Sequence, residues 1–165
     1  MKMGMVTRTG AVALLVSLAT LCVPAQFSAP AAAQPGSAFS IPEAQWIQPE
    51  ALNQVLQKGG AAKPLVLQVG SHVLFAQAHI PGSEYAGAGS QPEGLQILQQ
   101  RVNSLSRKAP IVLYCGCCPW NRCPNIEPAF SKLKEMGFTD VKVLYLAENF
   151  GADWAAKGYS VEKGR

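Results

Sequence analysis

The stretch PIVLYCGCCPWNRCPN, residues 110–125, combines a short apolar run with four closely spaced cysteines. Pro110 introduces the run IVLYC at 111–115, whose branched apolar residues are typical of a buried strand in a parallel sheet. The loop that follows holds four of the five cysteines of the chain. Asn125 is suited to cap a helix directly after the loop. The sequence therefore predicts a strand, a cysteine-rich loop and a helix in succession.

Further predicted strands and helices alternate on both sides of this unit. Strands are expected at 65–69 (LVLQV) and 141–146 (VKVLYL), with a short edge strand within 41–47. Helices are expected from Pro49 to the glycine pair at 59–60, from Pro92 onward, from Asn125 to about Met136 and over 148–157, with one or two helical turns at 71–78. This alternation predicts an α/β domain with a central, mostly parallel sheet covered by helices on both faces.

The first 33 residues have the pattern of a signal peptide and its cleavage region. Lys2 and Arg8 precede an uncharged apolar run at 11–23, and small residues and prolines follow. The apolar run is shorter than the roughly 20 residues that a membrane-spanning helix needs. An uncleaved anchor is the alternative. We expect an exported protein, periplasmic or secreted, with no stable membrane association after cleavage, a flexible arm at 34–42 and one domain at 43–163.

The charge of the chain gives no indication of a nucleic-acid partner. Beyond the leader, 12 Lys and Arg residues stand against 10 Asp and Glu residues. No basic run interleaved with aromatic residues is present in the sequence. The predicted export tells more than the charge about the chemistry of the cysteines, because disulfides persist in oxidising compartments.

Cys115 is the candidate nucleophile because it ends the predicted central strand. In open α/β sheets, ligands bind at the carboxyl ends of the strands. A helix N-terminus close to this point would favour a thiolate and lower the pKa of the thiol. Arg122 could hold an incoming oxyanion such as thiosulfate. The arrangement suits a displacement in which Cys115 takes sulfur from a donor and passes it to a nucleophilic acceptor.

Several landmarks in their order make the chain similar to a single rhodanese-like domain. They are LVLQVG, AHIPGSEY, PIVLYCG and GFTDVKVLYLAENFGADWAAKGYSV, and the resemblance extends over about residues 43–163. It implies a three-layer α/β/α fold and a sulfurtransferase that works through a Cys115 persulfide without a cofactor. It also implies a small sulfur-containing substrate and a thiol acceptor, which could be a protein. The active-site and substrate-binding loop would contain Gly116, Cys117, Cys118, Trp120, Arg122 and Cys123.

The loop departs from the common pattern of this family. Six residues separate Cys115 from Arg122, more than in the usual sulfurtransferase or phosphatase loop. Gln68 and Gly70 stand where many rhodanese-like domains have an aspartate and an arginine. The sequence therefore resembles an exported branch of the family with an extended, cysteine-rich active-site loop.

Three roles are open for Cys117, Cys118 and Cys123. They could be resolving thiols that attack the Cys115 persulfide, or Cys118 and Cys123 could form a structural disulfide. A bridge between the neighbours Cys117 and Cys118 would be strained. The spacing C-x-C-C-x4-C, which includes Cys115, could instead bind Zn²⁺ or Cu(I). The alternatives to a sulfurtransferase are therefore a thiolate metal-binding module and a thiol–disulfide redox or interaction protein.

Other residues around the loop have simpler interpretations. Trp120 could line a pocket or anchor the loop by packing, and Arg122 could be a solvated loop residue. Gly116 suits a tight turn, because it lacks a Cβ atom. His79 is interpreted as a turn-stabilising residue and His72 as a surface residue.

Overall fold

The computed structural model of the protein describes residues 41–60 and 63–164. The predicted signal peptide at 1–33 lies outside the described residues, as does the predicted arm except for its last two positions. Within the described ranges, no helix is long and apolar enough to cross a membrane.

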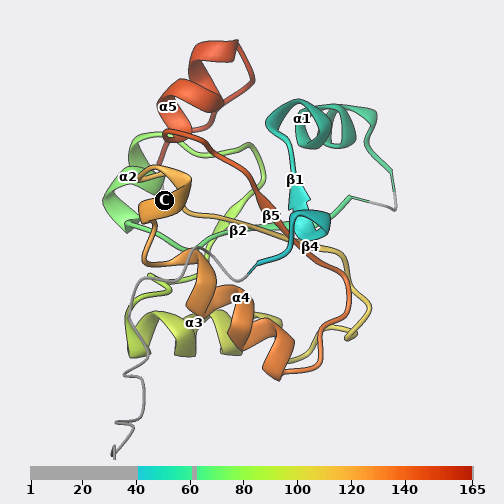
Figure 1. The fold of residues 1–165 in the computed structure, drawn as a ribbon. Coiled ribbons are helices and arrows are strands. Elements are labelled where there is room, and N and C mark those ends of the chain that lie inside the picture. Colours follow the sequence, from blue (N-terminus) through green and yellow to red (C-terminus); the bar gives the residue numbers. More distant parts are fainter. Residues whose placement is uncertain (1–40, 61–62, 165) are drawn as a thin grey trace, which may run out of the picture. The chain divides into compact units, whose positions relative to one another are not determined.

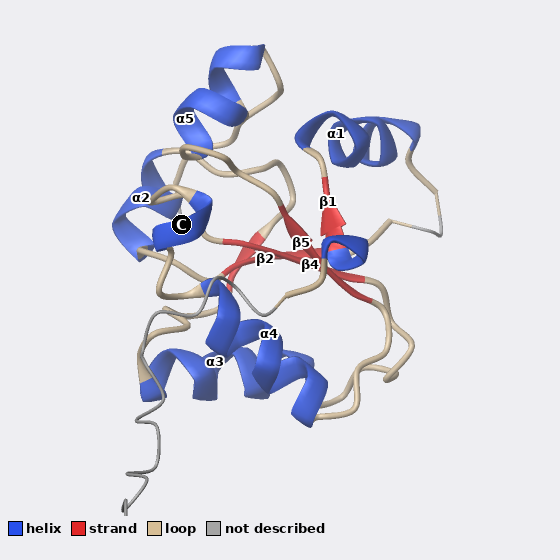
Figure 2. Ribbon diagram, viewed as in Figure 1, coloured by secondary structure: helices blue, strands red, loops and turns tan. Residues whose placement is uncertain are grey.

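The described residues form a five-stranded sheet with the strand order β1-β5-β4-β2-β3 (Figure 2). All neighbouring strands are parallel. The strands are β1 (Trp46–Ile47), β2 (Leu65–Gln68), β3 (Glu84–Tyr85), β4 (Ile111–Tyr114) and β5 (Val141–Leu144). Because β4 pairs with β2 on one side and β5 on the other, the cysteine loop begins at the centre of the sheet.

Helices cover both faces of the sheet (Figure 1). One face carries α3 (Pro92–Val102) and α4 (Ile126–Glu135), and the other carries α1 (Pro49–Lys58) and α5 (Phe150–Asp153). The short α2 (His72–Gln77) follows β2. Single 3₁₀ turns are η1 (Glu43–Gln45), η2 (Trp120–Arg122) and η3 (Ala155–Lys157). The predicted α/β fold, with a parallel sheet between two helical layers, is confirmed.

The alternation of side chains along β4 creates two cores. Ile111 and Leu113 pack with α3 and α4, and the next residue on this face is Cys115. Val112 and Tyr114 pack on the opposite face with α1 and α5. Successive side chains of a strand point to opposite faces, so the apolar run fills both cores. The candidate nucleophile therefore lies on the α3–α4 face.

The end of the chain differs from the prediction. The single helix expected over 148–157 is interrupted, because Trp154 separates α5 from η3. The Trp154 side chain is 1% exposed, and its indole N–H donates to the carbonyl of Ser160 at 2.9 Å. Burial of this large ring takes precedence over helix continuity. The two-residue strand β3 was not predicted, since it has too few residues to show an alternating pattern.

Candidate functional site

Cys115 follows β4 directly and is only 4% exposed. Gln68, the last residue of β2, donates from Nε2 to the Cys115 carbonyl at 2.9 Å. The Gln68 Oε1 atom accepts from the backbone N–H of Gly70 at 3.1 Å. A Cβ atom at Gly70 would lie 2.8 Å from both the carbonyl oxygen and the sulfur of Cys115. The end of β2 therefore fixes the backbone of Cys115 and leaves space for its thiol.

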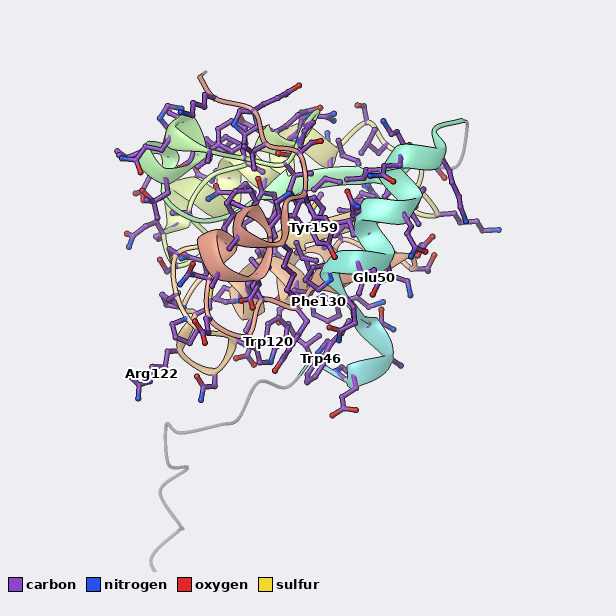
Figure 3. All side chains as sticks on the ribbon, turned by 90° about the horizontal axis from the view of Figure 1, so that it is seen from above. Trp46, Glu50, Trp120, Arg122, Phe130 and Tyr159 are labelled. Carbon is purple, nitrogen blue, oxygen red and sulfur yellow. The ribbon has the colours of Figure 1, made fainter. Side chains whose placement is uncertain are left out.

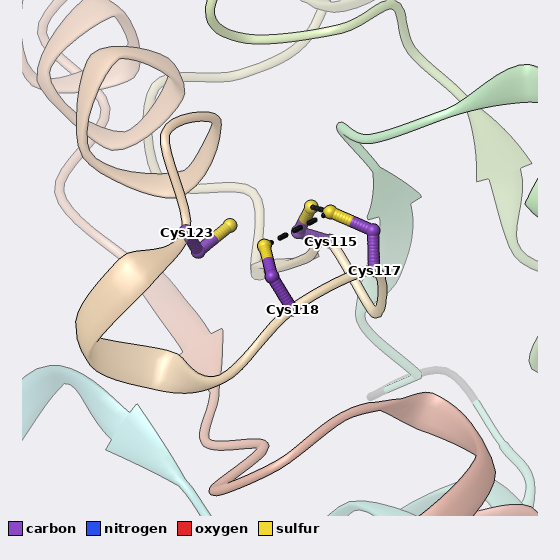
Figure 4. Close-up of side chains that lie close together, drawn as sticks. All are labelled: Cys115, Cys117, Cys118 and Cys123. Carbon is purple, nitrogen blue, oxygen red and sulfur yellow. Dashed lines mark hydrogen bonds between the residues drawn. The ribbon is translucent and has the colours of Figure 1, made fainter.

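The loop brings together the sulfur atoms of the four described cysteines (Figure 4). All four Sγ atoms lie within 4.8 Å of one another. Cys117 Sγ is 3.1 Å from Cys115 Sγ and 3.0 Å from Cys118 Sγ. Cys115 and Cys123 are buried, Cys118 is half-buried and Cys117 is exposed. The cluster therefore extends from the core to the surface.

All four cysteines of the cluster are free thiols. The disulfide considered between Cys118 and Cys123 is not formed, and neither is a bridge between Cys117 and Cys118. The distances from Cys117 Sγ to Cys118 Sγ and Cys115 Sγ, 3.0 and 3.1 Å, exceed the roughly 2.05 Å of a disulfide bond. The structure therefore describes these four cysteines as thiols, with no disulfide bond between any two of them.

Asn125 occupies the N-cap position of α4, as predicted, but its side chain contacts the thiols and does not cap the helix. Its Nδ2 atom donates to Cys115 Sγ at 3.3 Å and lies 4.0 Å from Cys117 Sγ. Its Oδ1 atom accepts from the backbone N–H of Ser90 at 3.0 Å. No capping hydrogen bond to α4 uses this side chain, which is 6% exposed. Asn125 thus supplies a buried amide donor to the sulfur of Cys115. A hydrogen bond of this kind favours the negatively charged form of the sulfur.

The pKa of Cys115 is raised to about 12, so the predicted lowering of its pKa is wrong. The Cys117 thiol lowers the pKa of Cys115, but the Cys123 thiol and burial together raise it by more. The pKa of Cys117 is also raised, first by the Cys115 thiol and then by burial. Thiols in contact cannot all ionise, because their negative charges would repel each other in a poorly solvated site. For Cys115, the Cys123 thiol and burial therefore outweigh the donors that favour a thiolate.

A pocket of about 310 Å³ borders the start of the loop. Its lining includes Cys115, Gly116 and Cys117 from the loop and Gln68 from β2. The opposite wall is formed by residues of α2 and by residues 149–151 at the start of α5. This volume is sufficient for a small anion or the end of a thiol-containing molecule. Buried Cys115 and exposed Cys117 both line this pocket, so both thiols border the space that such a molecule would occupy.

The model of the rhodanese-like domain family matches residues 41–146, which is more than half of the chain.

The chain belongs to the rhodanese-like domain family.

Solved structures agree with this membership at the level of the fold. The rhodanese-like domain of the Alr3790 protein from Anabaena sp., determined by NMR, is 22% identical and has a TM-score of 0.55, covering 72% of this chain and 79% of that chain. The BH2092 protein of Bacillus halodurans is also 22% identical, with a TM-score of 0.56 and coverage of 72% and 76%. A comparison with functionally curated proteins gives no match.

The aromatic residue of this rhodanese-like loop packs against the domain. The rings of Trp120 and Trp46 meet edge to face at 5.0 Å between centroids, and Trp120 lies 5.2 Å from Tyr145 (Figure 3). Trp120 is not among the residues that line the pocket. Of its two interpretations, the structure therefore favours anchoring of the loop.

Arg122 lies apart from the thiols of the rhodanese-like domain. It ends η2 and is exposed, and its side chain points outward in Figure 3. The described pocket has no arginine or lysine in its lining. Arg122 therefore does not place a positive charge beside Cys115, although the sequence predicted that it could hold an oxyanion there.

Other residues of the rhodanese-like domain have structural roles. Gly116 has a φ of +80°, a conformation that favours glycine, and forms the turn out of β4. His79 is buried, and its Nδ1 lies 2.8 Å from the Phe75 carbonyl. His72 is exposed, as predicted. Glu84, for which the sequence indicated no role, forms a bidentate ion pair with Arg101 of α3.

Proposed function

We propose that this protein is a sulfurtransferase in which Cys115 accepts sulfane sulfur and Cys117 carries it to the surface. One observation supports this proposal above others: the 3.1 Å contact between the buried Cys115 thiol and the exposed Cys117 thiol. Membership in the rhodanese-like domain family adds support, since the sequence resemblance to this family implies a persulfide at Cys115. We further propose that the protein acts after export, as the leader pattern predicts.

In the first step, the Cys115 thiol loses its proton to solvent, and the thiolate attacks the outer sulfur of a donor such as thiosulfate. The sulfur–sulfur bond of thiosulfate breaks, and sulfite leaves with the electron pair. The product is the Cys115 persulfide. The Asn125 amide can donate to this negatively charged group, since it already contacts Cys115 Sγ.

In the second step, the Cys117 thiolate attacks the terminal sulfur of the Cys115 persulfide. Cys115 leaves as a thiolate, and the sulfur now resides on the exposed Cys117. An acceptor thiol removes it in the same way and becomes a persulfide itself. No external oxidant or reductant is consumed. A small donor can enter the pocket that Cys115 lines, whereas the relay brings the sulfur to exposed Cys117, where an acceptor too large for the pocket can reach it.

Intact-mass measurement after incubation with thiosulfate, or with a small-molecule persulfide, tests the proposal. The wild-type protein should gain about 32 Da per transferred sulfur, and Cys115→Ser should gain none at its loop. Cys117→Ser should still load sulfur on Cys115 but should pass it to an acceptor thiol about 10-fold more slowly or worse. Absence of any gain by wild type with both donors would refute sulfur transfer. Equal release by Cys117→Ser would refute the relay.

A further inference from the structure

The four sulfur atoms of the cysteine loop lie close enough together to surround a single ion. All lie within 4.8 Å of one another and come from the single segment 115–123. Four thiolates around a tetrahedral ion with metal–sulfur bonds of about 2.3 Å lie roughly 3.8 Å apart. The observed spacings, from 3.0 Å upward, bracket that value. Small side-chain rotations would therefore place all four sulfurs around one ion.

We propose that Cys115, Cys117, Cys118 and Cys123 form a binding site for one thiophilic cation, Zn²⁺ or Cu(I). This inference goes beyond the proposed function and shares Cys115 and Cys117 with it. A metal ion and a persulfide are consequently alternative states of the same sulfur. In binding, the cation replaces the thiol protons, and no electron transfer is involved.

Two of the four ligands, Cys115 and Cys123, are buried, and the other two lie closer to the surface. Cys115 is tied at its carbonyl by Gln68 and at its sulfur by Asn125. Cys123 is 6% exposed and packs in the core between the sheet and α4. Cys117 and Cys118 lie on the outer part of the loop. A cation can therefore enter from the solvent side and complete its coordination on preformed inner ligands.

The choice of ligands indicates the class of cation. The four ligands are all sulfur, and in the described part of the chain this is the only group of three or more potential ligands that lie together. Thiolates favour Zn²⁺ and Cu(I) over Mg²⁺, Ca²⁺ or Mn²⁺, which prefer oxygen. The Asn125 amide beside Cys115 Sγ is an outer hydrogen bond of the kind that orients metal ligands. Zn²⁺ would use all four thiolates, whereas Cu(I) would use a subset of them.

The test is metal titration of the reduced protein, stripped with a chelator and kept free of oxygen. Zn²⁺ and Cu(I) are titrated separately against competing chelators, and Co²⁺ serves as a spectroscopic probe of tetrahedral thiolate coordination. We expect one ion per chain with a dissociation constant below about 10 nM at pH 7 for at least one of the two cations. The cation with the lower constant identifies the ion. Stoichiometric binding of neither cation overturns the proposal.

Variants connect the binding to the cluster. Cys123→Ser and Cys118→Ser should each weaken binding at least about 100-fold. Cys118 is half-buried in the loop, so its replacement tests the site even if the buried Cys123→Ser fails to fold. The control is His72→Gln, which removes an exposed metal-capable side chain outside the cluster and should leave the affinity unchanged. Unchanged affinity in Cys118→Ser, or a similar loss in His72→Gln, would overturn the assignment.

The readouts separate this inference from the proposed sulfur transfer. Metal binding is measured without any sulfur donor, and sulfur loading is measured on chelator-treated protein. A chain that loads sulfur but binds neither cation refutes the metal site alone. A chain that binds one ion but, once stripped, gains no sulfur refutes the transferase function alone.

Discussion

At the scale of single residues, the site depends on two buried amide side chains that carry no charge. Gln68 fixes the backbone of Cys115, and Asn125 donates to its sulfur. Both are almost completely buried, at 2% and 6% exposure. A buried polar group is maintained only where it is hydrogen-bonded, so each residue is committed to these contacts.

Asn125→Ala should lower the rate of sulfur loading on Cys115 by about 10- to 100-fold, because the persulfide loses a buried donor. Intact-mass time courses measure the rate. Asn125→Asp retains the Oδ1 acceptor for Ser90 but removes the donor and adds negative charge. Asn125→Asp should therefore load at least as slowly as Asn125→Ala. Recovery of the rate in Asn125→Asp would show that the residue acts only on the loop structure. Asn121→Ala, on the exposed part of the loop, is the matched control.

Gln68→Leu should destabilise the protein by about 2–4 kcal/mol. It leaves the Cys115 carbonyl and the Gly70 N–H without their present partner in a buried setting. Denaturant unfolding measures the loss. Gln99→Leu, at an exposed position of α3, is the control and should change stability little. A loss as small as that of the control would mean that water or backbone rearrangement satisfies both groups.

At the scale of elements, the helix ends differ in how they are stabilised. The α4 helix begins after the cysteine loop without a side-chain cap, because Asn125 is engaged with sulfur. The α5 helix has such a cap, since Asn149 Oδ1 accepts from the Ala152 N–H at 2.9 Å. Residues 149–151 also form one wall of the pocket. The capped end of α5 therefore defines the surface opposite the thiols.

Asn149→Ala should lower the free energy of unfolding by about 1 kcal/mol, the usual cost of losing an N-terminal cap. Asn149→Ser should retain most of the stability, because a serine hydroxyl can accept the same hydrogen bond. Thermal or denaturant unfolding of the three proteins measures this order. Equal losses in both variants would indicate that Asn149 contributes through packing rather than capping.

At the scale of the whole molecule, the loop is positioned by contacts between segments that are distant in the sequence. The two cores on the faces of the sheet hold β4 at the centre. At one edge, the Glu84–Arg101 pair connects β3 with α3, including a 2.8 Å contact from Nη2 to Oε1. The Arg101 hydrogen bond lowers the pKa of Glu84 more than burial raises it.

Glu84→Gln should reduce stability near neutral pH by up to about 1 kcal/mol, because both partners are partly exposed to solvent. The folded-state pKa of Glu84 is lowered, so its contribution is present above the ordinary glutamate range. The contribution disappears as the pH falls through the lowered pKa. Unfolding curves of wild type and variant should therefore differ at pH 7 and converge as the pH falls well below the ordinary glutamate range. A constant difference at all pH values would contradict the electrostatic origin.

The sequence was sufficient for the fold class, the main strands and the place of Cys115. Apolar runs bounded by proline and glycine indicate buried strands locally, and Pro49 and Pro92 mark helix starts without reference to the rest of the chain. The parallel order of the sheet follows from the alternation of strands and helices. These features depend on neighbouring residues, so a single sequence contains them.

The chemical environment of the sulfur depends on tertiary contacts. Asn125 carries a capping signal, yet the folded chain directs it to Cys115 because the loop returns across the end of β4. The expected low pKa of Cys115 is reversed by the Cys123 thiol and by burial, which together outweigh the lowering by the Cys117 thiol. Gln68 and Gly70 reach Cys115 only through the pairing of β2 with β4. Hydrogen bonding, burial and charge act through space, and distances between remote segments exist only in the folded chain.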